Sequence, residues 1–234
     1  MLFEEFGDFR KDEQGELMAK VIGVMGESGS GKTTSLDSLD PNTTFYINCD
    51  KKDLPFPKKI RNQYKEENRN YFKTDNQGTV LNLLEKIDKQ DNMKKIKVVV
   101  IDTLNGIMVA DERRRMKEKN YDKWADLAWS VYDIIDYSLS MRDDVTVILI
   151  AHVQTDRDDN GYMFSRIKTS GKKLDKIGIE TKLTTVLYSK ALPDGRYIFE
   201  THANNSTAKT PKGAFAQSEI PNNMAEVLKV LEEF

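Results

Sequence analysis

Residues 26–33 read Gly26-Glu27-Ser28-Gly29-Ser30-Gly31-Lys32-Thr33, which fits the pattern G-x-x-x-x-G-K-[ST] at every position. An apolar run at 21–25 precedes this stretch, and a run compatible with a helix begins at Thr34. Glycines let consecutive backbone N–H groups curl around phosphate oxygens, and the positive end of a following helix faces the same anion. Residues 26–34 are therefore predicted to form a phosphate-binding loop between a strand and a helix.

Two side chains of this loop have predicted chemical roles. A lysine at the position of Lys32 bridges the β- and γ-phosphates of a nucleoside triphosphate. A hydroxyl at the position of Thr33 is a ligand of Mg²⁺, which keeps water and phosphate oxygens as its other ligands. The expected cofactors are thus ATP and Mg²⁺, and Lys32 is a candidate catalytic residue.

Composition limits the remaining function classes. The chain has 234 residues, enough for one good core, and we expect one ATPase domain over 20–234. Its 36 basic and 38 acidic residues give a formal charge of -2, so any DNA contact must come from a local basic patch. The single cysteine, Cys49, suits a reducing compartment. No apolar stretch resembles a signal peptide or a membrane span, so we expect a soluble, cytoplasmic protein without a membrane partner.

Residues 1–19 form a candidate N-terminal arm, in which Phe3, Phe6 and Phe9 recur at every third position among acidic groups. Such a segment either packs on the edge of its own domain or docks on a neighbouring subunit. The sequence leaves both alternatives open.

Asp50, Asp102 and His152 each end a run that is rich in β-branched residues and reads as a strand. In open parallel sheets, ligands bind beyond the carboxyl ends of the strands. Asp102 ends a Walker B pattern, and its carboxylate is expected to hold Mg²⁺ directly or through water. Asp50 is expected to hold the attacking water or, alternatively, to cap a turn. His152 is expected to sense the γ-phosphate or, alternatively, to have a structural role.

The polar segment 153–180 is long for a compact domain and is expected to be a mobile loop. It interleaves aromatic rings with basic side chains, a mixture that binds single-stranded nucleic acid. A flexible surface loop with ordinary lysine content is the alternative. A second basic run, at 112–117, is expected to be a solvated helix face, with a contact to DNA or a partner as its alternative. The candidate DNA-binding residues are Tyr162, Phe164, Arg166, Lys168, Lys172 and Lys173.

Periodicity predicts the elements around these motifs. Apolar residues at helical spacing predict covering helices that begin at Asn76 and over 121–141, and a short helix closes the chain. The runs at 184–188 and 196–201 flank a Pro-Asp-Gly turn and predict an antiparallel hairpin. Residues 51–75 are expected to be an irregular, solvated connection.

Together, these landmarks resemble the RecA-like ATPase core, and more closely the phage RecA/RadA-like ATPases that act as single-strand annealing recombination proteins. The resemblance covers most of the chain from about residue 18. It implies an α/β fold with a RecA-like P-loop NTPase core, a mostly parallel central sheet, helices on both faces and a C-terminal antiparallel hairpin. The residues that carry it lie at 26–34, 46–50, 100–103, 150–153, 185–188 and 208–213.

The resemblance also implies roles and partners. Asp50 takes the position of the catalytic glutamate, and His152 that of the residue linking the γ-phosphate to the DNA loop. Lys209 and Lys212 fall near the lysines that reach a neighbouring subunit's ATP. Because Asp50 is one methylene shorter than glutamate, weak, DNA-stimulated hydrolysis is expected. The implied partners are single-stranded DNA, further copies of the chain in a filament or ring, and a single-strand-binding protein, in the cytoplasm of the host of a phage or prophage.

Three other functions remain open from the sequence. A DNA motor or helicase loader has the same core, and a non-catalytic module can use ATP as a structural switch. A small-molecule P-loop kinase is the third. The absence of an arginine-rich lid from the sequence and the additional strand between the P-loop strand and the Walker B strand argue against the kinase.

Overall fold

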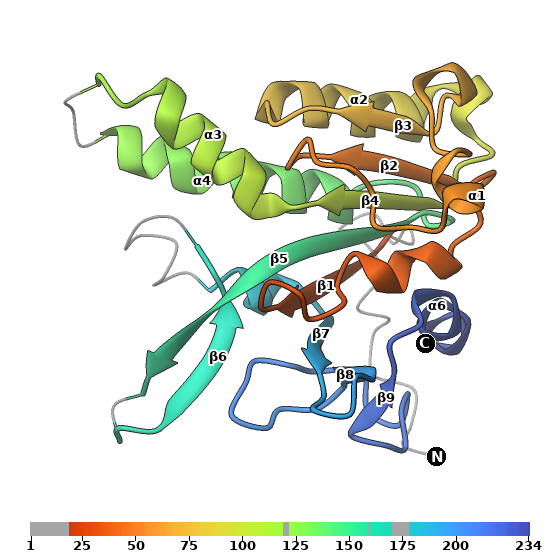
Figure 1. The fold of residues 1–234 in the computed structure, drawn as a ribbon. Coiled ribbons are helices and arrows are strands. Elements are labelled where there is room, and N and C mark those ends of the chain that lie inside the picture. The colour runs from red at the N-terminus through yellow and green to blue at the C-terminus, as the bar shows by residue number, and fades with distance from the viewer. Residues whose placement is uncertain (1–18, 119–121, 159, 170–177) are drawn as a thin grey trace, which may run out of the picture.

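In a computed structural model, residues 19–118, 122–158, 160–169 and 178–234 are described, and they form a nine-stranded sheet with helices on both faces (Figure 1). Apart from Ala19, the candidate N-terminal arm lies outside the described residues. The strands are β1 (Lys20–Gly26), β2 (Thr44–Asn48), β3 (Tyr71–Lys73), β4 (Val98–Asp102), β5 (Thr146–Arg157), β6 (Met163–Ile167), β7 (Thr185–Ala191), β8 (Tyr197–Glu200) and β9 (Glu219–Pro221).

Most of the helices lie in the first two thirds of the chain, between the parallel strands. The α-helices are α1 (Lys58–Arg61), α2 (Gln77–Lys89), α3 (Leu104–Arg114), α4 (Asp122–Leu139) and α6 (Met224–Leu231). The 3-10 helices are η1 (Thr34–Ser38), η2 (Glu66–Asn68), η3 (Asp91–Met93) and η4 (Ile179–Lys182). The helix expected after the phosphate-binding loop is thus the short η1.

The strand order β3-β2-β4-β5-β1-β7-β8-β9 places the candidate site residues along one edge of the sheet. Strands β3 to β7 in this order are parallel, whereas β8 pairs antiparallel with β7 and β9 pairs antiparallel with β8. In the register, Gly26 at the end of β1 lies opposite His152 of β5 and Ser189 of β7. Asp102 at the end of β4 lies opposite Asn48 of β2. The predicted α/β fold with a mostly parallel sheet and a C-terminal antiparallel hairpin is confirmed.

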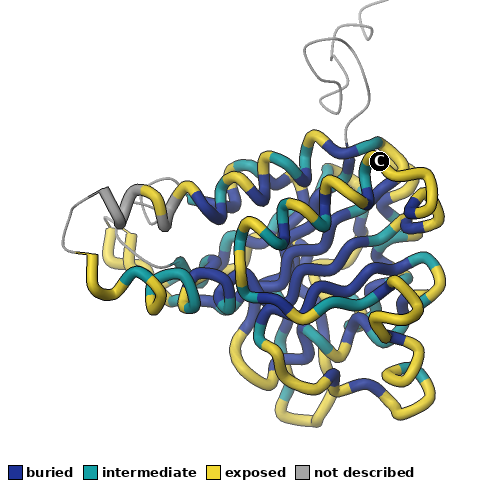
Figure 2. The backbone as a smooth tube through the Cα atoms, turned by 90° about the horizontal axis from the view of Figure 1, so that it is seen from above, coloured by how far each residue is buried: buried dark blue, intermediate teal, exposed yellow. Residues whose placement is uncertain are grey.

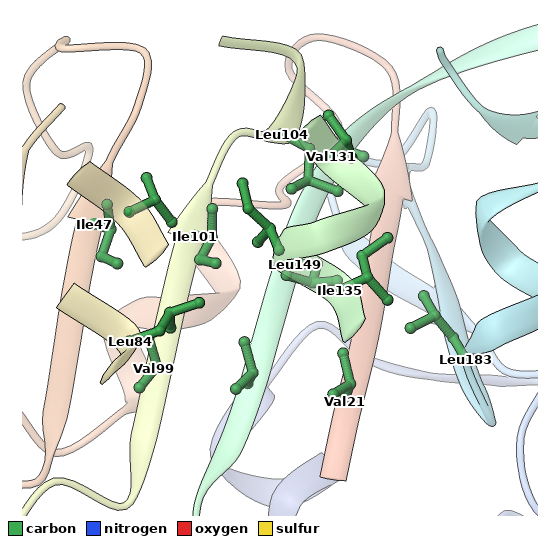
Figure 3. Packing of buried hydrophobic residues seen from close by; sticks show 14 of the residues in the cluster. Val21, Ile47, Leu84, Val99, Ile101, Leu104, Val131, Ile135, Leu149 and Leu183 are labelled. Carbon is green, nitrogen blue, oxygen red and sulfur yellow. The ribbon is translucent and has the colours of Figure 1, made fainter. Parts of the chain in front are cut away.

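One face of the sheet is covered by α2, α3 and α4. Alternate strand residues such as Ile47, Ile101 and Leu149 point to this face and are at most 1% exposed (Figure 3). Leu84 of α2 and Ile135 of α4 are fully buried against them. Burial of each such side chain contributes about 1.5–3 kcal/mol, so this layer fixes the position of α3, which begins beside the site.

The other face is covered by η1, α6 and part of the segment 51–75. Phe56 and Tyr64 from that segment are buried in the same cluster as Tyr46 of β2, with ring centroids 6.0 and 5.7 Å from that of Tyr46. The expectation of an irregular, solvated connection therefore holds for most of the segment but not for these buried side chains. The segment also contains α1, η2 and the edge strand β3, which are too short to show a periodic pattern in the sequence. Figure 2 shows the buried strands at the centre of the molecule and the exposed residues around them.

The segment after His152 is not the loop that the sequence predicted. Residues 146–152 of β5 pair with β1, whereas residues 153–157 pair only with β6. The two strands form an antiparallel ribbon that projects beyond the sheet (Figure 1). The α3–α4 pair projects on the same side of the molecule in this view. None of the described helices is both long and apolar enough to cross a membrane.

Candidate functional site

The phosphate-binding loop connects β1 to η1 and surrounds a cavity of about 270 Å³. Gly29 and Gly31 have φ angles of 80° and 92°, a backbone conformation that residues with a Cβ rarely adopt. A Cβ on Gly31 would also lie 2.8 Å from the ring of Tyr197. The hydroxyl of Ser189 on β7 donates a 2.7 Å hydrogen bond to the carbonyl of Ser30 and so fixes the loop against the sheet. Residues 28–34 all line the cavity.

Lys32 is folded onto its own loop. Its ammonium donates hydrogen bonds of 2.7 and 2.6 Å to the carbonyls of Gly26 and Glu27. The side chain is buried, and this burial lowers the pKa of the ammonium to about 8, although the carboxylate of Asp102 opposes the shift. The buried Lys32 ammonium has lost part of its hydration, and a phosphate bound in the cavity would compensate for that loss.

Asp102 lies at the end of β4 and is 2% exposed. Its Oδ2 accepts hydrogen bonds from the hydroxyl of Thr33, at 2.9 Å, and from the hydroxyl of Tyr46. Its Oδ1 is buried without a partner among the described residues. Burial raises the pKa of this carboxyl above its ordinary value, against the hydrogen bond from Tyr46.

These groups fit a Mg²⁺ ion that is bound together with a nucleotide. The unpaired carboxylate oxygen of Asp102 and the hydroxyl of Thr33 are hard oxygen ligands, which Mg²⁺ prefers. The described residues contain no group of three or more His, Cys, Asp or Glu side chains that could hold a metal by themselves. Phosphate and water oxygens would have to complete the coordination, as is usual for Mg²⁺ at triphosphates.

Asp50 follows β2 and approaches the first turn of α3. Its Oδ1 accepts a 2.8 Å hydrogen bond from the hydroxyl of Thr103, which caps α3 by accepting from the N–H of Gly106. A Cβ on Gly106 would lie 2.7 Å from this carboxylate, so glycine permits the close approach. Lys52 forms a 2.8 Å ion pair with Oδ2. Burial alone would raise the pKa of Asp50, but the hydrogen bonds from Lys52 and Thr103 outweigh burial and lower it.

His152 is held at its backbone by a bridge from α3. The side-chain carbonyl of Asn105 accepts from the His152 N–H at 2.7 Å, and its amide donates to the Lys168 carbonyl at 2.9 Å. The Lys168 N–H in turn donates to the His152 carbonyl at 2.7 Å. Burial and the charge of Lys32 lower the pKa of His152, so its imidazole is neutral at pH 7.

His152 also lines a second, wider cavity of about 700 Å³, which is bounded by α3, by the residues that follow β2 and by Lys168 after β6. Arg113 and Lys168 line this cavity and are exposed. Within the described ranges, neither side chain has a hydrogen bond or an ion pair. Arg114 and Lys51, by contrast, both pair with Asp75. The wider cavity thus carries two available positive charges next to the phosphate cavity.

The candidate DNA-binding residues are distributed unevenly. Tyr162 precedes β6 near the ribbon tip and is 70% exposed, while Phe164 and Arg166 are half-buried. Alternate positions share a face of a strand, so Phe164 and Arg166 of β6 lie on one face of the ribbon. Arg166 forms an ion pair with Asp156 on the same face. Lys172 and Lys173 lie outside the described residues.

Lys209 and Lys212 follow β8 in the chain. The backbone of Lys209 forms two 2.8 Å hydrogen bonds with Val186 of β7. Among the described residues that line the two cavities, neither lysine appears. Their expected role toward a neighbouring subunit stays a prediction.

Sequence reasoning missed three residues of the site: Tyr46, Lys52 and Asn105. Tyr46 reads as an ordinary strand residue, and Lys52 as one of several lysines in a connection. Of the three, only Asn105 could be found from a local signal, because it lies in the first turn of the helix that follows the Walker B strand.

Residues 18–212 match the model of a protein family described as AAA domain. The match includes the phosphate-binding loop, the strand ends and the ribbon. A search of curated proteins gives no match.

Proposed function

Because the chain belongs to the AAA domain family of P-loop ATPases, we propose that it hydrolyses ATP and uses the nucleotide state to control its binding of single-stranded DNA, as a phage recombination and annealing protein. One observation carries this proposal. His152 lines both the phosphate cavity and the wider cavity that carries the charges of Arg113 and Lys168.

The chain's own residues have distinct roles at the nucleotide. Lys32 would leave the carbonyls of Gly26 and Glu27 and bind the β- and γ-phosphates. Thr33 and Asp102 would hold Mg²⁺, which neutralises charge on these phosphates when bound. Asp50 would orient the attacking water and accept its proton, and it must first be released from its ion pair with Lys52.

Single-stranded DNA would bind along the wider cavity and the ribbon. Arg113 and Lys168 would contact backbone phosphates, and Tyr162 offers an exposed ring for base stacking. Arg166 already pairs with Asp156 and contributes less positive charge. The chain's net charge of -2 supports a local contact of this kind rather than a broad basic surface.

The bridge made by Asn105 supports coupling between the two ligands. It joins the start of α3, directly after Asp102, to β5 at His152 and to the end of β6 at Lys168. A γ-phosphate that binds the neutral imidazole of His152 would bias the position of this bridge and of the ribbon. Reciprocity of binding energies then requires DNA to raise the affinity for ATP.

Assembly completes the proposal. A filament or ring would place Lys209 and Lys212 of one subunit at the ATP of the next, where they would stabilise charge that develops in the transition state. Residues 1–19 would contact a neighbouring subunit, and a single-strand-binding protein would deliver the DNA.

A paired-variant experiment tests the DNA site. Arg113→Ala combined with Lys168→Ala removes two positive charges from the wider cavity. Lys58→Ala combined with Lys59→Ala removes two from α1, which lies away from the ribbon (Figure 1). Binding of a fluorescent oligothymidylate is measured by anisotropy over a range of salt concentrations, with an ATP analogue present.

The Arg113→Ala, Lys168→Ala variant should lose at least tenfold in affinity for DNA. The slope of log K against log salt concentration should also decrease in magnitude by about 1.4, since each phosphate contact to a single strand contributes about 0.7. The α1 variant should resemble the wild type, and both should bind the ATP analogue normally. Equal effects of the two double variants on DNA binding would contradict this DNA site.

A further inference from the structure

Two consecutive lysines after β2 point in opposite directions. Lys51 has a φ angle of 57° and forms a 2.7 Å ion pair with Asp75. Lys52 turns back to the phosphate cavity, where it forms its ion pair with Asp50. The left-handed turn at Lys51 therefore separates two neighbouring charges onto different sides of the chain.

The backbone of Lys52 is anchored, whereas its side chain is accessible. Asn48, which is 2% exposed on β2, donates a 2.6 Å hydrogen bond to the Lys52 carbonyl. The same amide donates to the hydroxyl of Tyr71 at 2.8 Å. The Lys52 side chain is 51% exposed, so its ammonium can change partners while its Cα stays in place.

The charges around the cavity favour such a change. Lys52 is close enough to Lys32 for its charge to lower the pKa of Lys32, and it interacts with the carboxylate of Asp102. Two ammonium groups thus face one cavity that residues 28–34 line with backbone and hydroxyl groups. A triphosphate brings enough negative charge for both, whereas a diphosphate lacks the terminal group.

We propose that Lys52 is a ligand of the γ-phosphate and a latch on Asp50. Without nucleotide, or with a diphosphate, Lys52 stays paired with Asp50 and occupies Oδ2. With ATP, the ammonium moves to a γ-phosphate oxygen and Oδ2 becomes free. Asp50 then accepts a proton as the water oxygen bonds to the γ-phosphorus, and the bond to the β–γ bridging oxygen breaks with its electron pair leaving on ADP.

This inference rests on the proposed ATPase function but not on DNA binding. It distinguishes Lys52 from Lys32, which binds the β-phosphate as well and is needed for both nucleotides. The specific consequence is selective affinity: Lys52 contributes to binding of a triphosphate and not of a diphosphate.

The test compares Lys52→Ala with Lys51→Ala, an adjacent variant with the same change of net charge. Affinities for ATPγS and ADP are measured in Mg²⁺ buffer without DNA, by competition with a fluorescent nucleotide. Lys52→Ala should lose about tenfold or more in affinity for ATPγS, as expected for a lost hydrogen bond between charged groups, with little change for ADP. Lys51→Ala should keep the wild-type ratio of the two affinities, and Lys52→Arg should restore most of it.

Single-turnover hydrolysis provides the second readout. Lys52→Ala should slow hydrolysis at saturating ATP, because the γ-phosphate has lost a positive partner. The release of Asp50 in this variant does not replace that charge. An unchanged ATPγS-to-ADP ratio in Lys52→Ala would overturn the inference. Failure of the wild type to bind ATP would instead overturn the proposed function, so the two failures are distinguishable.

Discussion

Replacing Tyr46 by phenylalanine removes one hydroxyl group from the interior and leaves its ring in place. The hydroxyl donates to Oδ2 of Asp102, and both residues are buried. The ring packs against Phe56 and Tyr64, contacts that phenylalanine keeps. The variant therefore isolates one hydrogen bond to a buried carboxylate.

The magnitude follows from the partners. A hydrogen bond to a charged group contributes about 1.5–3 kcal/mol, and Thr33 still donates to the same oxygen, so we expect a loss of about 2 kcal/mol in the free energy of unfolding at neutral pH. For a chain of this size the melting temperature should fall by about 4–8 °C. This loss should make the Asp102 carboxylate harder to keep ionised in the folded state.

The pH dependence has a definite sign. Burial already raises the pKa of folded Asp102 above its unfolded value, so the cost of its charge is fully present above the folded pKa and vanishes below the unfolded pKa. The hydroxyl of Tyr46 stabilises the charged form. The difference between wild type and Tyr46→Phe should therefore be larger at pH 7.5 than at pH 5.

Urea unfolding without nucleotide, followed by circular dichroism at both pH values, measures this difference. Tyr64→Phe is the matched control, because it removes a second buried tyrosine hydroxyl from the same aromatic cluster, one that does not donate to Asp102. Its stability should stay within about 0.5 kcal/mol of the wild type. Equal effects of the two substitutions, or a Tyr46→Phe effect that grows toward pH 5, would contradict a stabilising hydrogen bond from Tyr46 to ionised Asp102.

Three further predictions concern the loop and its coupling. Because nucleotide binding needs charged Lys32 and its pKa is about 8, affinity for ADP should fall about tenfold between pH 7 and pH 9 in a competition assay, and Lys32→Arg should flatten this dependence. Gly31→Ala should lower the melting temperature more than Gly29→Ala, since only the first adds a clash with Tyr197; equal shifts in thermal unfolding would contradict this. Asn105→Ala should retain ATP binding but lose the nucleotide dependence of DNA binding, and anisotropy in ADP and in ATPγS would show whether that dependence survives.

The phosphate-binding loop and the acidic strand ends could be located from sequence because their signals are local. A glycine pattern fixes the first, and the carboxyl ends of parallel strands share an edge, which brings Asp102 to the loop. The contact from Tyr46 could not be predicted in this way. It depends on the register of β2 against β4, which no local pattern encodes.

The ribbon and the turn at Lys51 are two features for which sequence patterns give no signal. Residues 154–157 are exposed or half-buried, so they lack the apolar alternation that marks a half-buried strand, and the sequence predicts a loop there. The two directions of Lys51 and Lys52 follow from a left-handed turn at a residue that is not glycine. Sequence gives no reliable signal for such a turn.

Binding of single-stranded DNA by the wild type, measured by anisotropy without nucleotide, with ADP and with ATPγS, tests the central claim most directly. We expect ATPγS to strengthen DNA binding at least fivefold over ADP, the lower end of usual coupling energies, and added salt to weaken it. Equal affinity in all three states would contradict the coupling through His152. Absence of binding in every state would contradict the DNA-binding function and favour a phosphoryl acceptor in the wider cavity.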